Sequence, residues 1–148
     1  MNKEGENKII IEKVEEIGEI INELANKLAS VETGMEILSS EMKKTVVSVL
    51  NYTAQGFSEY RLDLSFKYLQ MSLSLLRMLE YYNYVSRKVG YLSSSPYCLL
   101  RDKIRDVETH ILLSVRYLRQ KEHKKKVDLP TLEEAEFMLR PSHRDPSI

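Results

Sequence analysis

The side chains most often used in catalysis and metal binding are few in this chain and widely spaced. The histidines are His110, His123 and His143, and Cys98 is the single cysteine. No histidine follows a glutamate by three positions, as a di-iron bundle requires, and no His-Glu-x-x-His, cysteine pair or glycine-rich phosphate loop occurs. Cys98 and His110 lie far apart in the sequence, so Cys98 is interpreted as a small apolar residue. We therefore expect no enzymatic activity, no metal and no cofactor.

One carboxylate, Glu80, falls on the apolar seam of residues 59–89, and Asn83 follows it on the same seam. A charge in an apolar seam costs several kcal/mol unless it is paired or protonated. Acid–base catalysis needs a second titratable group that converges on the first, and the sequence shows none for Glu80. We expect Glu80 and Asn83 to be core polar residues that fix helix register through a hydrogen bond or an ion pair.

Basic residues recur at helical spacing in the C-terminal half, and they could follow a phosphate backbone. The solvated face of an ordinary bundle has the same appearance, so both interpretations stand. Tyrosines in this region could stack on bases, although tyrosines more often pack at subunit interfaces. The candidate nucleic-acid-binding residues are Arg87, Lys88, Arg101, Arg105, Arg116, Arg119, Lys121, Lys124, Lys125 and Lys126.

The formal net charge of the chain is zero, but charge is distributed unevenly along it. Residues 1–59 sum to −5, residues 60–126 to +8 and residues 127–148 to −3. Two halves of opposite charge can attract each other across solvated helix faces. The same distribution can also present a basic surface to RNA or to another acidic partner.

Four amphipathic segments must position these side chains. Apolar residues repeat at intervals of three and four over residues 9–31, 35–55, 59–89 and 97–123, which predicts four helices. The stretch TVVSVLNYT has strand propensity, but the helical spacing continues through it. The breaks are placed at Thr33-Gly34, at Gly56 to Ser58 with Ser58 as the next N-cap, and at residues 90–96. Such short connections predict an all-α, up-down-up-down antiparallel four-helix bundle over residues 1–126.

The remaining residues, 127–148, differ in composition. Thr131 and Glu134 have capping-box spacing, so we expect a short C-terminal tail helix that ends near Arg140 and is followed by a mobile end. No run approaches the roughly eighteen apolar residues of a membrane span, and the N-terminus lacks a signal-like segment. With one cysteine in addition, we expect a cytoplasmic protein.

Residues 60–85 carry more apolar side chains than one buried face requires. One stripe, from Leu62 through Leu69 to Leu76, suits the core of the bundle. A helix that is apolar nearly all round is buried on more than one side, so we expect the second stripe to contact another copy of the chain. This candidate oligomer interface consists of Leu64, Tyr68, Met71, Leu75, Met78 and Tyr82.

Several short motifs follow one another at spacings that belong to a known family. They are Ser48-Val49, Ala54-Gln-Gly-Phe57, Tyr68-Leu69, Leu76-x-x-Leu79-Glu80, Gly90-Tyr91-Leu92 and Ser114-Val-Arg-Tyr-Leu118. Over residues 10–120 the chain resembles the ribosomal-protein-like four-helix bundle proteins encoded in intervening sequences of bacterial 23S ribosomal RNA genes. That family includes the accessory variability determinant of diversity-generating retroelements. The chain departs from the family pattern at Tyr52, Gln55 and Met78.

The resemblance implies a homopentamer that is not an enzyme and that binds a reverse transcriptase and RNA. The alternative hypothesis is a protein-interaction scaffold of the same family without direct nucleic-acid binding. In that case the tail helix would dock a partner protein.

Overall fold

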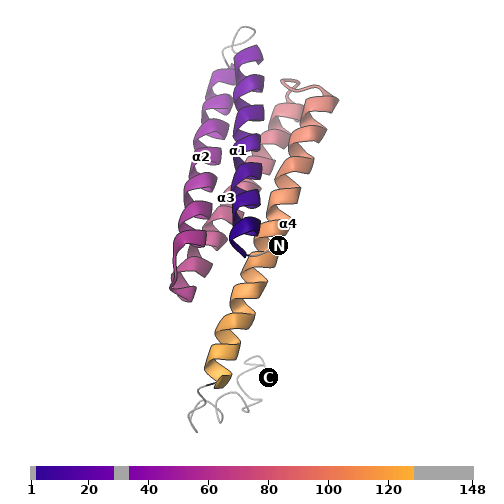
Figure 1. Cartoon of the computed structure of the whole chain (residues 1–148). Helices are drawn as coiled ribbons and strands as arrows, with labels where there is room; N and C mark the ends of the chain where they lie inside the picture. The colour runs from indigo at the N-terminus through magenta and orange to yellow at the C-terminus, as the bar shows by residue number, and fades with distance from the viewer. Residues whose placement is uncertain (1–2, 29–33, 129–148) are drawn as a thin grey trace, which may run out of the picture.

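Four long helices make up the part of the chain that the computed structural model describes, which is residues 3–28 and 34–128. They are α1 (Lys3–Leu28), α2 (Gly34–Ser58), α3 (Leu62–Lys88) and α4 (Ser94–Asp128). Each helix packs against its two neighbours in the order α1, α2, α3, α4 and back to α1. Figure 1 shows the four helices running alternately up and down. The predicted all-α, up-down-up-down bundle is therefore confirmed.

The core lies where the apolar stripes of all four helices meet. Its fully buried side chains include Ile17 of α1, Val49 of α2, Leu69 and Leu76 of α3, and Ile104 of α4. All five belong to the three-and-four spacing that predicted the helices. Burial of each such side chain contributes about 1.5–3 kcal/mol relative to an exposed position.

The turn between α2 and α3 differs from the predicted one. Helix α2 continues through Gly56 to Ser58, and the Ser58 hydroxyl donates back to the carbonyl of Gln55 at 3.2 Å. Ser58 is therefore not the N-cap of α3. The N-cap is Arg61, which is extended and makes no side-chain cap bond. The backbone N–H of Arg61 donates instead to the Glu59 carboxylate at 3.0 Å.

Gly56 does not end α2, and it lies instead where α2 contacts α3. It is buried inside α2, and a Cβ atom at this position would lie 2.7 Å from Cδ2 of Leu69 on α3. The Ser65 hydroxyl of α3 donates to the Gly56 carbonyl. The absence of a side chain thus lets α2 and α3 approach each other closely.

In the connection between α3 and α4, two backbone N–H groups donate to one carbonyl group. Gly90 adopts a φ of +87°, which glycine tolerates without strain. The N–H groups of Tyr91 and Leu92 both donate to the Ser86 carbonyl, at 2.8 and 3.1 Å. Helix α4 then starts at Ser94, so Pro96 lies within its first turn, where proline is tolerated.

Helix α4 is longer than predicted and runs to Asp128. Figure 1 shows its C-terminal part extending beyond the start of α1. The predicted boundary between bundle and tail at residue 126 therefore falls within a continuous helix. The predicted tail helix at 131–140 lies outside the described residues. None of the described helices is long and apolar enough to cross a membrane.

Candidate functional site

Helices α3 and α4 form a seam to which four of the ten candidate basic residues belong. Two contacts fix their antiparallel register: the Arg119 guanidinium lies 5.0 Å from the ring centre of Phe66, and Arg105 Nε lies 3.4 Å from Glu80 Oε1. Arginine side chains from α4 thus lean across toward α3. The surface they share is called the arginine face here and consists of Arg77, Arg101, Arg105, Arg116 and Arg119.

Arg77 was absent from the sequence-based set because no basic residue lies three, four or seven positions from it on α3. It lies near Glu108 of α4, close enough for its charge to act on that carboxyl group. Arg101 is the least available member, since its Nε donates to Asp102 at 3.1 Å and its guanidinium lies over Tyr97. Arg105 is more accessible, with 64% of its side chain exposed.

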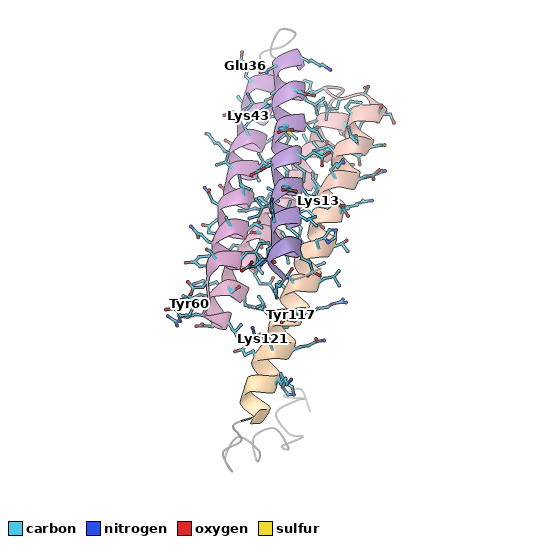
Figure 2. All side chains as sticks on the ribbon, viewed as in Figure 1. Lys13, Glu36, Lys43, Tyr60, Tyr117 and Lys121 are labelled. Carbon is cyan, nitrogen blue, oxygen red and sulfur yellow. The ribbon has the colours of Figure 1, made fainter. Side chains whose placement is uncertain are left out.

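The other candidate basic residues lie at the two ends of the bundle. The Arg87 guanidinium donates a hydrogen bond to the Leu92 carbonyl at 3.3 Å, beside the α3–α4 connection, and Lys88 is exposed there. Lys121 and Lys124 are exposed on the far part of α4, where Figure 2 places Lys121 below Tyr117. Lys125 and Lys126 continue this helix, but their side chains lie outside the described residues. The ten predicted residues therefore form three groups and no single patch.

Glu80 lies at the edge of the core and not within it, because 30% of its side chain is exposed. Asn83 is buried, and its Nδ2 donates to the Tyr97 carbonyl at 3.1 Å, which ties α3 to the first turn of α4. Its Oδ1 has no hydrogen-bond partner.

A second carboxyl group converges on Glu80, although none was expected from the sequence. This group is Glu108, half-buried on the side of α4 that faces α3. Burial, followed by the charge of Glu80 and a hydrogen bond to it, raises the pKa of Glu108 to about 7. Arg77 and Arg105 oppose this shift. The signal in the sequence was the spacing of Glu108 between Arg105 and Leu112, on the same helix face.

Part of the charge asymmetry holds the bundle together. Helix α1 carries four lysines and seven glutamates, whereas α4 carries nine basic and five acidic residues. Lys103 pairs with Glu16 at 2.8 Å, and Lys13 pairs with Asp106 across the same α1–α4 seam. Both pairs lie on the side of α4 away from the arginine face. Attraction between the halves and a basic surface therefore coexist on opposite flanks of α4.

The second apolar stripe of α3 remains partly exposed in the single chain. Met71 and Met78 are 37% and 46% exposed, and Tyr68 stacks on Tyr52 of α2 with ring centres 6.3 Å apart. Leu75 and Tyr82 are half-buried and pack against the core. This surface, called the methionine face here, consists of Leu64, Tyr68, Met71, Leu75, Met78 and Tyr82, and it lies on the α2 side of α3.

Metal-binding clusters are absent from the described residues. No group of three or more His, Cys, Asp and Glu side chains in residues 3–28 and 34–128 could hold a metal ion. Cys98 is half-buried, with its sulfur 4.0 Å from the Ser94 hydroxyl. His110 contacts Asp106 at 3.5 Å on the α1 side of α4.

Comparisons with known proteins identify the fold. No family model and no curated protein matches the chain. The bundle is similar to the crystal structure of a protein of unknown function from the S23 ribosomal protein family, from Bacteroides thetaiotaomicron. The TM-score is 0.67 at 12% sequence identity, and the match covers 75% of this chain and 98% of that chain. At such low identity the likeness establishes the four-helix fold alone.

Proposed function

We propose that this protein is a non-enzymatic accessory protein that binds RNA through its arginine face and assembles with copies of itself. The observation that carries the RNA part is the position of five arginines along one α3–α4 seam, away from the acidic α1. Guanidinium groups suit phosphate because their planar donors bind two oxygens at once. Four of these arginines, Arg77, Arg105, Arg116 and Arg119, are exposed.

Self-association is proposed through the methionine face. Methionine and tyrosine side chains adapt well to a second apolar surface, and this face leaves both of its methionines partly open to solvent. The family resemblance of the sequence supports a pentamer and extends the proposal to a reverse transcriptase as a protein partner. The similar solved structure adds support for the shared bundle only.

Salt-dependent RNA binding tests the proposal. Each arginine that neutralises a phosphate releases a counterion, so the logarithm of affinity should fall linearly with the logarithm of salt concentration. Replacing Arg116 and Arg119 by Gln should weaken binding at ~50 mM salt and reduce the slope by about 2. A filter-binding or fluorescence titration with structured RNA, carried out near pH 6, measures both quantities.

The matched control also removes two positive charges, by Lys43→Gln and Lys44→Gln on α2. These lysines lie on a helix that does not form the seam, so the slope should stay close to that of the parent. The RNA part of the proposal fails if the parent does not bind at ~50 mM salt or binds without salt dependence. A persistent oligomer without RNA binding would favour the scaffold hypothesis instead.

A further inference from the structure

Two carboxyl groups and two arginines meet at the middle of the arginine face. Glu80 comes from α3 and Glu108 from α4, and the charge of Glu80 acts on Glu108. Arg105 contacts Glu80 at 3.4 Å, and Arg77 and Arg105 both act on Glu108. The two acids therefore occupy the position where a phosphate backbone on this face would have to pass.

The pair is poorly arranged for two negative charges. Oε1 of Glu108 is shielded from solvent and has no hydrogen-bond partner. While both groups are ionised, neither can donate a hydrogen bond to the other, and the like charges repel. One proton on Glu108 lets it donate to Glu80 and removes the repulsion. This geometry explains why the pKa of Glu108 is raised to about 7.

The protonation state of the pair sets the charge that a phosphate meets. With both carboxylates ionised, they balance the positive charges of Arg77 and Arg105. With one proton bound, the cluster of four groups carries a net charge of +1. A phosphate near these arginines in turn favours the protonated pair, because linkage between two binding events is reciprocal.

We propose that binding of a phosphodiester backbone to the arginine face is coupled to uptake of a proton by the Glu80–Glu108 pair. This inference rests on the proposed function, since it describes how the same surface is regulated. RNA binds more tightly when the pair holds a proton, and RNA binding draws a proton onto the pair near neutral pH.

The groups that face the pair belong to α3 and α4. Arg77 flanks it on α3, and Arg105 flanks it on α4. Helix α1 meets the other side of α4, where Lys13, Glu16 and their partners lie. No charged group of α2 acts on Glu108. Among the described residues, the test also has to separate the pair from the histidines His110 and His123.

The test measures binding of a fluorescently labelled structured RNA, the probe that also tests the proposed function, at about pH 6, 7 and 8 and constant salt. The full-length parent should bind about twofold to fivefold more tightly at pH 6 than at pH 8, the effect of one unit charge near the surface. Glu108→Gln should bind at pH 8 as tightly as the parent does at pH 6. His110→Gln and His123→Gln should keep the pH dependence of the parent.

A second measurement needs no variant and keeps the inference testable if Glu108→Gln folds poorly. Calorimetric titration of the parent in two buffers of different ionisation enthalpy near pH 7 should reveal net proton uptake on binding. Binding that is independent of pH and takes up no proton would overturn the inference and leave the proposed function intact. No binding at any pH would overturn both. pH dependence that persists in Glu108→Gln would also refute the role of the pair.

Discussion

Glu108 shows how strongly the ionisation of one residue depends on a neighbour from another helix. On an exposed helix face its carboxyl group would titrate near pH 4, far from neutrality. In the bundle it meets Glu80, and burial and repulsion raise its pKa to about 7. Helical spacing reveals which residues share a face of one helix. It does not reveal which residues of two helices meet, so Glu108 and Arg77 could not be assigned to the cluster from sequence.

The raised pKa has a consequence for stability that a single substitution can measure. The folded chain holds a proton that the unfolded chain releases, so this contribution is fully present below about pH 4.5 and is lost as pH rises through 7. Glu108→Gln should therefore be more stable than the parent at pH 8, by roughly 1 kcal/mol after allowance for solvent screening. At pH 5 the difference should be small. Urea unfolding at both pH values provides the comparison.

A suitable control is Glu19→Gln, which removes an exposed carboxylate from α1. Its stability relative to the parent should change little between pH 5 and pH 8. If Glu108→Gln is no more stable than the parent at pH 8, the two carboxylates do not repel each other enough to destabilise the fold.

At the scale of helices, the contact between α2 and α3 distinguishes what spacing predicts from what only packing reveals. The three-and-four repeat predicted four helices and their order, because each helix must bury one apolar stripe. The sequence-based break at Gly56 rested on a different rule, because glycine usually marks a turn or a helix cap. The structure instead uses Gly56 for close approach to Leu69. Tight contact between two helices leaves no periodic signal in either of them.

Two glycine substitutions separate these roles. Gly56→Ala would place a methyl group 2.7 Å from Cδ2 of the fully buried Leu69, so it should destabilise the protein by about 1–3 kcal/mol. Gly18→Ala is the matched control, because its nearest neighbour, Cγ1 of Val46, lies at an ordinary 3.8 Å. It should stabilise α1 by about 0.5–1 kcal/mol. Thermal or urea unfolding of both variants gives the sign, and equal effects at the two sites would contradict the close-approach role.

At the scale of the whole molecule, the two flanks of α3 differ in chemistry. One flank contributes to the arginine face and the other to the methionine face, so a ring of copies joined through the methionines could leave the arginines accessible. The excess of apolar residues over 60–85 predicted this second surface. Burial refines it, because Leu75 and Tyr82 also support the core whereas Met71 and Met78 are partly exposed.

Charge substitution on the methionine face tests the proposed assembly. Met71→Glu combined with Met78→Glu should convert an oligomer into folded monomers of 17.3 kDa, because burying two carboxylates at an interface is unfavourable. Light scattering coupled to size-exclusion chromatography measures the mass, and circular dichroism checks the helix content. The parent should give five times the monomer mass if it is a pentamer.

Val47→Glu is the control, since Val47 is 55% exposed on α2 outside the methionine face. It should leave the oligomer mass unchanged. A monomeric parent, or a double variant that keeps the parental mass, would exclude the methionine face as the interface.

The far end of α4 has one more consequence, which concerns how the molecule could be extended. Among the side chains of α4 that the structure describes, Leu118 is the last buried one, and the helix continues for ten residues to Asp128. Isolated helices this short are only marginally stable in water. These last turns are therefore stabilised by the packed turns of α4 that precede them. None of the side chains described after Leu118 belongs to the core cluster. This end of α4 is therefore a natural fusion point, where a tag or a second domain can be joined through a continuous helix while the core remains intact.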